Sequence, residues 1–331
     1  MNPNDEPAHA TTAAAPAADE AASAHATTVA AIEAAVERKP DIGATLDKGW
    51  RALVDPAWLV GWDPQRFDLG DGCTEVVVMG EGPDVVLMPP LPGFKESWLA
   101  VAARLRQSYR VVTFDQRSRF AGAPSWDVLL ADVLRLLDVF APGPAIVIGH
   151  SMGAALAQRW ALAHPQRLRA LVLSSGFARV RNPAGNVYAR FIEQPLVIAS
   201  QRLLPSGAAR SIARVLARHG RWVYDARCDD RLLDFIRHCM SHTSAATART
   251  AVALVMAHDT TALAPRITVP TLVLVGERES VFSRPAAEEL ARLIPGAVLR
   301  ESPGVSHLHP LTNPEWFVDT VEQWLGTRLR G

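Results

Sequence analysis

The sequence predicts an α/β fold in which helices flank a mostly parallel sheet of eight strands. Short, continuously apolar runs such as I-V-I-G and L-V-L-V indicate strands that are covered on both faces. These runs alternate with segments whose apolar residues recur at helical spacing, which is typical of parallel sheets with right-handed crossovers. A length of 331 residues, 49% of them hydrophobic, suits one large domain with an insertion.

Two segments precede the predicted sheet. Residues 1–28 are rich in Ala, Thr and Pro and lack large apolar side chains. They are predicted to be a disordered tail, because they cannot offset the entropy lost on ordering. Residues 29–64 are predicted to be a helical extension, with a short helix over residues 29–38 and an amphipathic piece over residues 48–59.

The sheet is expected from β-rich runs that are first separated by turn signals and later by helices. The turns D-G and G-E-G-P between the first three runs are typical of hairpins. The predicted strands cover residues 66–69, 74–79, 84–88, 109–114, 145–149, 169–174, 271–275 and 297–300. The predicted core helices cover residues 97–107, 126–140, 152–164, 284–293 and 314–325.

One connection between core strands is much longer than the others. Nearly a hundred residues without a convincing strand follow Ser174, and a stretch of that length is not a plain loop. Helical spacing recurs in it over residues 187–204, 208–222, 230–240 and 245–258. Residues 177–265 are therefore predicted to be a helical cap, inserted between the two parts of the core at residues 65–176 and 266–331.

Charge and cysteine content argue against several classes of protein. Lys plus Arg and Asp plus Glu both number 34, so nothing indicates binding to nucleic acid. Three cysteines without C-x-x-C spacing disfavour a disulfide framework or a cysteine-based zinc site. No run approaches the roughly 20 apolar residues of a membrane span, and the first residues lack the features of a secretory signal. A cytoplasmic protein is expected.

Ser151 lies in the sequence I-G-H-S-M-G, where a predicted strand meets a predicted helix. This is the G-x-S-x-G pattern of a nucleophile elbow. Gly149 and Gly153 have no Cβ, so the chain can turn sharply enough to raise the serine above the end of the sheet. The following helix directs N–H groups toward an oxyanion formed there. A tight turn can show the same letters, but the strand before and the helix after favour a catalytic serine.

A serine nucleophile requires a base and an acid that orients the base. The turn after strand 271–275 carries Glu277 and Glu279, and the loop after the last strand carries His307 and His309. The order serine, acid, histidine is that of the α/β-hydrolases. Turn geometry decides which glutamate faces the histidine, so Glu277 remains a rival to Glu279. His309 precedes Pro310 and is expected to pack or to face solvent.

Residues 66–325 resemble an α/β-hydrolase of the capped esterase, lactonase and C–C hydrolase type. Five motifs carry the resemblance in the order of the family: L-M-P-P-L-P-G, V-T-F-D-Q-R, I-G-H-S-M-G, P-T-L-V-L-V-G-E-R-E and G-V-S-H-L-H-P…N-P-E-W-F. The resemblance implies the α/β-hydrolase fold, with Ser151 as the nucleophile, His307 as the base and Glu279 as the acid. The family usually has Asp at the acid position, but Ser-His-Glu variants exist.

The loop expected to stabilise the oxyanion departs from the family pattern. Relatives usually carry His-Gly there, whereas this chain has P-P-L-P-G at residues 89–93. Proline has no N–H, which restricts the donors to Leu91 and Gly93. The resemblance places Leu91 at the donor position, paired with the N–H of Met152. A rigid turn without a catalytic role is the structural alternative.

Other polar residues near these motifs are given structural roles. Asp115 and Arg117 are expected to form an ion pair with each other at a strand end. His150 is expected to point away from the hydroxyl of Ser151 and to act only in positioning. The remaining candidates, expected to be solvated, capping or helix-end residues, are Asp127, Asp132, Asp138 and His164.

The expected activity is hydrolysis of a carboxylic ester, thioester or lactone through an acyl-enzyme, without a metal or organic cofactor. The substrate is expected to be a small ester-like molecule with an apolar portion, since apolar cap residues can form a pocket or the cap's own core. These residues are Phe191, Ile192, Leu196, Ile198, Leu203, Trp222, Tyr224 and Phe235.

Other activities on the same fold remain open. A serine at the elbow argues against haloalkane dehalogenase and epoxide hydrolase chemistry, which would require an aspartate there. C–C bond hydrolysis, proline-type peptidase activity and acyl transfer use the same elbow. A binding or receptor module with an idle triad, and an oxygenase or lyase on the same scaffold, are alternatives from other classes.

Overall fold

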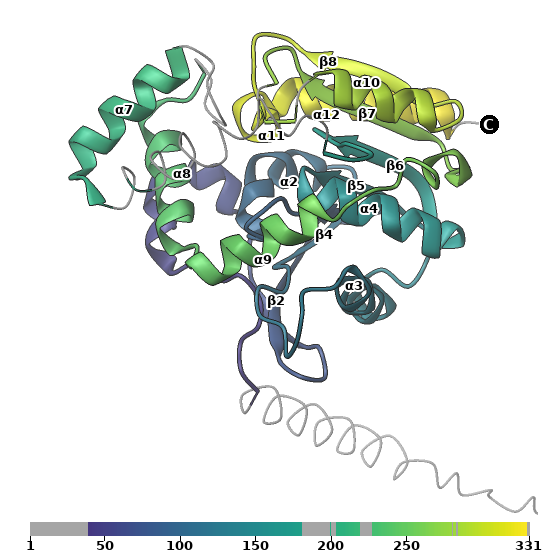
Figure 1. Cartoon of the computed structure of the whole chain (residues 1–331), viewed down its shortest axis with the longest axis horizontal. Coiled ribbons are helices and arrows are strands. Elements are labelled where there is room, and N and C mark those ends of the chain that lie inside the picture. Colours follow the sequence, from purple (N-terminus) through teal and green to yellow (C-terminus); the bar gives the residue numbers. More distant parts are fainter. Residues whose placement is uncertain are drawn as a thin grey trace, which may run out of the picture.

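The computed structural model of the chain describes residues 39–180, 199, 203–218, 227–279, 281–282 and 284–329. An eight-stranded sheet runs through it in the order β1-β2-β4-β3-β5-β6-β7-β8 (Figure 1). The pairs β1–β2 and β2–β4 are antiparallel, and the other neighbouring pairs are parallel. The expected α/β fold with a mostly parallel eight-stranded sheet is therefore confirmed.

The strands lie within a few residues of the predicted ranges. The largest shift is at β8, which begins one residue later than expected and continues to Ser302. The strands are β1 Gln65–Asp68, β2 Cys73–Met79, β3 Asp84–Met88, β4 Arg110–Phe114, β5 Ala145–His150, β6 Leu168–Ser174, β7 Thr271–Gly276 and β8 Val298–Ser302.

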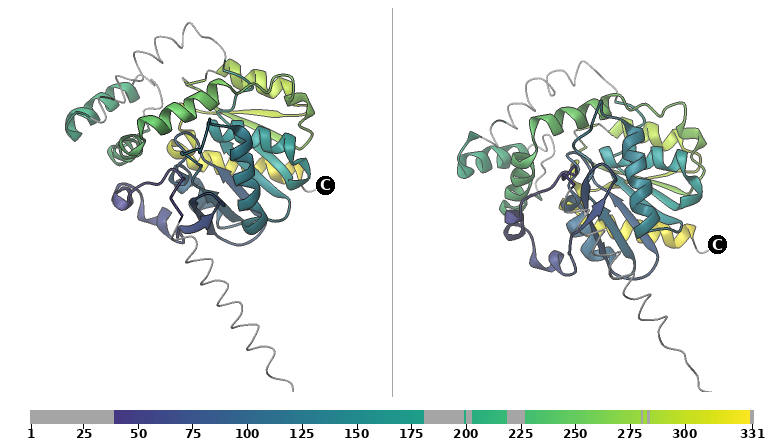
Figure 2. Two further views of the ribbon diagram at one scale, coloured as in Figure 1. Left: turned by 60° about the horizontal axis from the view of Figure 1, so that its bottom comes forward. Right: turned by 90° about the horizontal axis from the view of Figure 1, so that it is seen from below.

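Helices cover both faces of the sheet (Figures 1 and 2). On one face α3 (Trp126–Phe140), α4 (Met152–Ala163) and α10 (Arg284–Leu293) pack against strand residues such as Val86 and Val147. On the other face α2 (Leu99–Leu105) and α12 (Pro314–Arg328) pack against Val85 and Ile146. Neighbouring residues of a strand point to opposite faces, so a sheet that is covered on both sides needs uninterrupted apolar runs.

The N-terminal segment reaches the sheet through two short 3-10 helices, η1 (Lys48–Leu53) and η2 (Pro56–Leu59). The side chains of Asp47 and Asp55 cap their first N–H groups. Pro56 starts η2, which divides the amphipathic piece expected over residues 48–59 into two. Trp50 of η1 is buried and meets the ring of Phe235 edge to face, with 6.4 Å between the ring centroids.

Among the described residues between β6 and β7 there are three α-helices: α7 (Ser206–Arg218), α8 (Asp230–His242) and α9 (Ala245–Met256). In Figure 1, α7 and α8 extend to one side of the sheet. Arg210 of α7 forms an ion pair with Asp234 of α8 at 2.6 Å. α9 packs on the core through Ala251, Leu254 and Val255. No helix among the described residues is long and apolar enough to cross a membrane.

Several predictions concern residues that the structure does not describe. The tail over residues 1–28 and the helix over residues 29–38 lie outside the described residues. So do residues 187–198 of the first predicted cap segment and residues 219–222 of the second. Among the apolar cap residues, the same holds for Phe191, Ile192, Leu196, Ile198, Trp222 and Tyr224.

The expected ion pair between Asp115 and Arg117 is wrong. Asp115 instead accepts a hydrogen bond from the ammonium group of Lys95 at 2.8 Å, and that group also lies within 3.0 Å of Glu75 and Glu96. Burial by itself would lower the pKa of Lys95, but the three carboxylates raise it above its usual value. Lys95 therefore stays a cation, held as a structural counter-ion in a buried acidic cluster.

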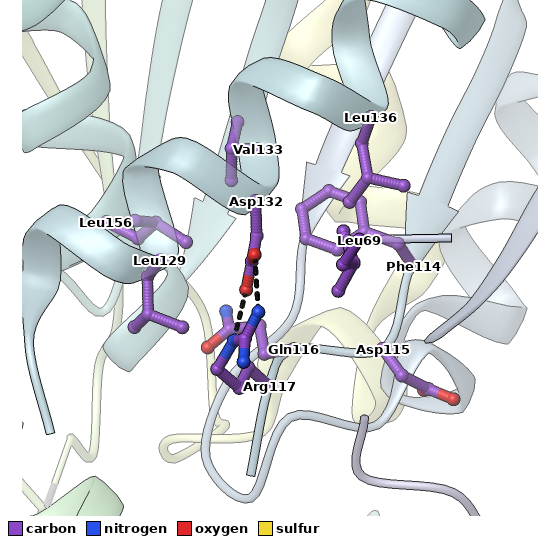
Figure 3. A pocket seen from close by; sticks show the side chains of 10 residues that line it. All are labelled: Leu69, Phe114, Asp115, Gln116, Arg117, Leu129, Asp132, Val133, Leu136 and Leu156. Atoms are coloured by element: carbon purple, nitrogen blue, oxygen red, sulfur yellow. Dashed lines mark hydrogen bonds and ion pairs between the residues drawn. The ribbon is translucent and has the colours of Figure 1, made fainter. Parts of the chain in front are cut away.

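Arg117 binds two other carboxylates, those of Asp71 and Asp132, with N–O distances of 2.7–2.8 Å. Figure 3 shows the pair with Asp132. Asp132 is 6% exposed, so the expectation that it is solvated is also wrong. A cavity of about 10 Å³ beside this pair has room for about one water molecule. β4 ends at Phe114, so neither residue belongs to a strand, and the partners of Asp115 and Arg117 come from different elements packed around this chain end.

Candidate active site

Ser151 lies at the junction between β5 and α4 in a strained conformation. Its φ is +55° and its ψ is −117°, a region that side-chain-bearing residues rarely adopt. Its N–H donates to the carbonyl oxygen of Ser174 at 2.9 Å, which ties the elbow to the neighbouring strand β6. A Cβ at Gly149 would lie 2.2 Å from the carbonyl oxygen of Gly153, so the turn closes only with glycine there. The sharp turn predicted from the sequence is present.

His307 and Glu279 meet at the carboxyl ends of β8 and β7. The Nδ1 atom of His307 lies 3.0 Å from both carboxylate oxygens of Glu279. The carboxylate of Glu277 instead accepts a hydrogen bond from the N–H of Gly304 at 2.7 Å. Of the two glutamates in this turn, Glu279 is therefore the one bonded to the histidine.

Backbone hydrogen bonds fix the direction of both side chains. The N–H of Glu277 donates to the carbonyl of Ser302, and the N–H of Arg278 donates to that of Val305, each at 2.9 Å. The turn after β7 is thereby joined to the loop that carries the histidine. A Cβ at Gly276 would lie 2.3 Å from the carbonyl oxygen of Ser306, so only glycine permits this close approach.

Glu279 is buried but remains a carboxylate. Burial alone would raise its pKa, but the charge of His307 and the hydrogen bonds it accepts lower the pKa from 4.5 to about 2. Besides His307, the donors are the hydroxyl of Ser175 at 2.6 Å and the N–H of Val281 at 2.9 Å. The negative charge can therefore fix the imidazole ring and stabilise its protonated form.

Ser175 was not singled out from the sequence. It follows β6 directly and has a φ of +46°, and its hydroxyl holds the side of the Glu279 carboxylate. The sequence offered one weak signal: two consecutive serines, Ser174 and Ser175, lie where the strand beside the elbow strand ends. Its role follows from the pairing of β6 with β7, which brings Ser175 to within hydrogen-bonding distance of the turn after β7.

A buried chain of hydrogen bonds lies behind the elbow. The Oγ atom of Ser174 is 2.9 Å from Nδ1 of His150 and 3.0 Å from Nε2 of His309. Burial, together with the charge of His307, lowers the pKa of His150 well below its usual value. Burial also lowers the pKa of His309, to about 3, so both rings are neutral near pH 7.

These contacts define the roles of two histidines more closely. His150 bonds Ser174, as expected for a residue that points away from the nucleophile. His309 is fully buried, so the packing expectation holds and the solvent alternative is wrong. The ring centroids of His150 and His307 are 4.9 Å apart, which places the imidazole of His307 beside the residue that precedes Ser151.

The loop of residues 89–93 lies against the N-terminus of α4. A Cβ at Gly153 would lie 2.1 Å from the carbonyl oxygen of Met88 and 2.6 Å from that of Pro89, so the elbow and the end of β3 are in close contact. The side chain of Gln116 donates to the carbonyl of Pro89 at 2.6 Å and braces the loop. Met152 is the first residue of α4, so its N–H has no acceptor within the helix.

Comparison with known proteins agrees with this fold. The model of the "Alpha/beta hydrolase family" matches residues 85–320. The chain therefore belongs to this family. It is an enzyme with hydrolase activity, and it is similar to esterases and lactonases.

Similar proteins cover most of the chain. It is 29% identical over 254 residues to a pimeloyl-[acyl-carrier protein] methyl ester esterase of Chromobacterium violaceum, covering 76% of this chain and 98% of the relative. The crystal structure of the enol-lactonase from Burkholderia xenovorans LB400 has a TM-score of 0.61 and 25% identity, covering 76% of this chain and 97% of that one. A hydrolase from Pseudomonas aeruginosa PA01 has a TM-score of 0.64 and 26% identity, covering 80% and 98%.

Proposed function

We propose that the chain is a serine hydrolase that cleaves a carboxylic ester, thioester or lactone through an acyl-enzyme. In this mechanism the Oγ atom of Ser151 attacks the substrate carbonyl while Nε2 of His307 takes its proton. Glu279 holds the imidazole through Nδ1 and stabilises the imidazolium that forms. The histidine then returns the proton to the leaving group, and water discharges the acyl-enzyme by the same route.

The observation that carries this proposal is the buried pair of Glu279 and His307 next to the strained elbow. Because Glu279 occupies Nδ1, the other ring nitrogen of His307 is left for proton transfer. Among the described residues, no hydrogen bond joins the hydroxyl of Ser151 to His307. Hydrogen bonds of this kind commonly tighten only when substrate binds.

The oxyanion would be held by the N–H groups of Leu91 and Met152. The close contact of Gly153 with the end of β3 brings these two segments together, and Gln116 braces the loop. The N-terminus of α4 adds its positive dipole at the same position. A single donor of this kind contributes roughly 3–4 kcal/mol to the transition state.

The substrate class follows from the relatives and from the chain's own apolar residues. By their names, the similar proteins act on a methyl ester and on an enol-lactone. We place the helices between β6 and β7 over the site as a cap that encloses the apolar part of the substrate. Phe235 is not part of that wall, since it is 2% exposed and packs on Trp50. Leu203 is 82% exposed and remains a candidate. A cytoplasmic location stays a prediction.

A fluorophosphonate probe tests the nucleophile, and a series of p-nitrophenyl esters of increasing acyl length tests the substrate. We expect the wild-type chain to be labelled and Ser151→Ala to lose both labelling and esterase activity, by roughly 10⁴–10⁶-fold in kcat. Ser211→Ala is the matched control, because this serine is exposed on α7 and its hydroxyl donates to the carbonyl of Gly207 in the same helix.

The outcomes separate the remaining activities. Labelling that survives Ser151→Ala would refute the proposed nucleophile, and a folded chain that is never labelled would favour a binding module. A labelled chain that cleaves aromatic ketones or proline peptides faster than esters would move the assignment to C–C hydrolysis or peptidase activity. Ester consumption that requires an added alcohol would indicate acyl transfer.

A further inference from the structure

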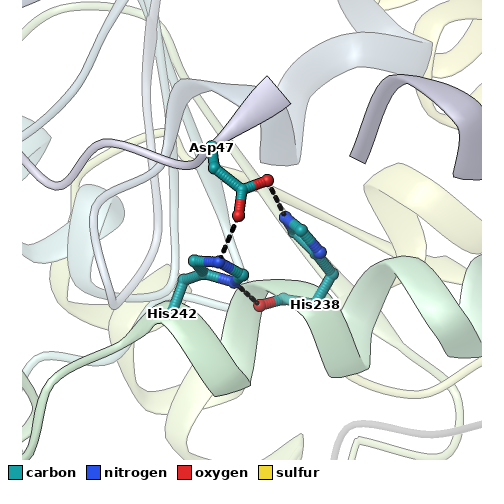
Figure 4. Close-up of side chains that lie close together, drawn as sticks. All are labelled: Asp47, His238 and His242. Carbon is teal, nitrogen blue, oxygen red and sulfur yellow. Dashed lines mark hydrogen bonds and ion pairs between the residues drawn. The ribbon is translucent and has the colours of Figure 1, made fainter. Parts of the chain in front are cut away.

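Asp47, His238 and His242 form a cluster of possible metal ligands that the proposed mechanism does not use (Figure 4). Asp47 precedes η1, and the two histidines are one helical turn apart on α8, so their side chains share a face. The Nε2 atoms of His238 and His242 lie 3.2 Å and 2.6 Å from the carboxylate of Asp47. One possible ligand atom from each residue lies within 4.8 Å of the others.

The ring of His242 has polar neighbours at both nitrogens. Its Nδ1 atom lies 2.9 Å from the carbonyl oxygen of His238 and 3.2 Å from the hydroxyl of Ser241. Its Nε2 atom faces the carboxylate of Asp47, which is also an acceptor. When Nδ1 donates its hydrogen to that carbonyl, the lone pair of Nε2 is directed at the position beside Asp47 where a metal ion could bind. Histidines that bind metal typically donate their other N–H to such a carbonyl.

The other two residues are arranged in the same way. The Nε2 atom of His238 is buried and makes no hydrogen bond of good geometry, although it is aimed at the carboxylate. Burial, and then the charge of His242, lower the pKa of His238, which favours the neutral form that binds metal. The N–H of Gly49 donates to Oδ1 of Asp47 at 2.7 Å and orients that carboxylate.

We propose that Asp47, His238 and His242 bind a divalent transition-metal ion, for which Zn²⁺ is the best match. Bonds of about 2.0–2.2 Å in a tetrahedral site hold neighbouring ligand atoms about 3.3 Å apart. The two histidines face different oxygens of Asp47, Oδ1 at 3.2 Å and Oδ2 at 2.6 Å, and one ligand atom of each residue lies within 4.8 Å of the others. Small side-chain movements would bring these atoms to the spacing of a zinc site. Two imidazoles with one carboxylate favour zinc over calcium or magnesium, and water completes the coordination.

The ion would join two parts of the chain that are about 190 residues apart. Asp47 adjoins η1, which already packs on α8 through Trp50 and Phe235. A metal at the edge of this apolar contact would hold the N-terminal segment against the helices between β6 and β7. Its role would be structural, and it does not depend on the proposed hydrolase mechanism.

The test is calorimetric titration of the full-length, untagged chain with ZnCl₂ at pH 7.5 after treatment with EDTA. We expect one Zn²⁺ per chain, and at a hundred times the dissociation constant a rise in Tm of about 4 °C. Asp47→Asn, His238→Gln and His242→Gln should each weaken binding at least about 100-fold. Co²⁺ should give the visible absorption of a tetrahedral complex, and zinc should slow hydrogen exchange in η1.

His164→Gln is the matched control, because His164 lies outside the cluster and stacks on Trp160. It should bind zinc like the wild type, and all variants should have the wild-type circular dichroism spectrum in EDTA. Absence of zinc binding, or binding that survives the three substitutions, would overturn the proposal.

Discussion

The pairing of Glu279 with His307 leads to a prediction in which two glutamates in one turn behave differently. Lowering the pKa of Glu279 from 4.5 to about 2 corresponds to roughly 3 kcal/mol, at 1.36 kcal/mol per pKa unit. The side chain is 1% exposed, so solvent screens this interaction little. Glu279 therefore stabilises the fold above pH 4.5, and its contribution is lost as the pH falls from 4.5 toward 2.

The perturbation is Glu279→Gln, with Glu277→Gln as the matched control. Urea unfolding between pH 3 and pH 7 should show that the wild type loses about 2 kcal/mol more than Glu279→Gln on going to pH 3. The kcat of Glu279→Gln should fall by about 10⁴-fold, because the imidazole is no longer held in the productive tautomer. Glu277→Gln should lose about 1 kcal/mol or less and stay within a few-fold of wild-type kcat, since the carboxylate of Glu277 accepts a single neutral hydrogen bond among the described residues, from the N–H of Gly304.

The effects of Glu279→Gln and Glu277→Gln on kcat and on unfolding free energy are compared. If Glu277→Gln proved as damaging to kcat as Glu279→Gln, the assignment of the acid would be wrong. If the unfolding free energies of wild type and Glu279→Gln decreased by the same amount from pH 7 to pH 3, the interaction of Glu279 with His307 would not contribute the stability calculated above.

Two further substitutions test the elbow and the buried histidines. Gly153→Ala places a Cβ 2.1 Å from the carbonyl oxygen of Met88, so we expect a loss of about 2–4 kcal/mol and of probe labelling. Gly207→Ala on α7 meets nothing within 4 Å and should be neutral or stabilising by up to about 1 kcal/mol, and equal effects on unfolding would contradict this. The pKa of His309 is about 3 in the folded protein and near 6.5 in the unfolded chain. The free energy of unfolding therefore decreases as the pH is lowered from 6.5 toward 3, because only the unfolded chain takes up the proton. His309→Gln should flatten that part of the pH–stability curve, and an unchanged slope would argue against a neutral buried ring.

Local sequence was enough to predict the fold. Continuous apolar runs indicate strands that are buried on both faces of a sheet. Glycines on either side of a serine indicate a sharp turn that only small residues permit. Both signals depend on a few adjacent residues, so they need no knowledge of distant contacts. For this reason the strands and the elbow at Ser151 were found close to their observed positions.

Charge partners were predicted less well than strands. Asp115 and Arg117 are two residues apart, and the sequence made them natural partners, yet each binds residues from other elements. Lys95 is buried among three carboxylates, which come from β2, from the short 3-10 helix η3 (Lys95–Trp98) and from the end of β4. Ion pairing depends on which elements pack together, and composition does not show this.

What the sequence determined by itself was the kind of chemistry, through an elbow serine followed by an acid and a histidine in the order of the family. What only the tertiary structure decided was which carboxylate reaches the histidine. Glu277 and Glu279 lie in the same turn, and the hydrogen bonds of that turn to the loop after β8 send one side chain to Gly304 and the other to His307. The cluster of Asp47 with two histidines of α8 arises in the same way, since packing brings together residues that the chain holds far apart.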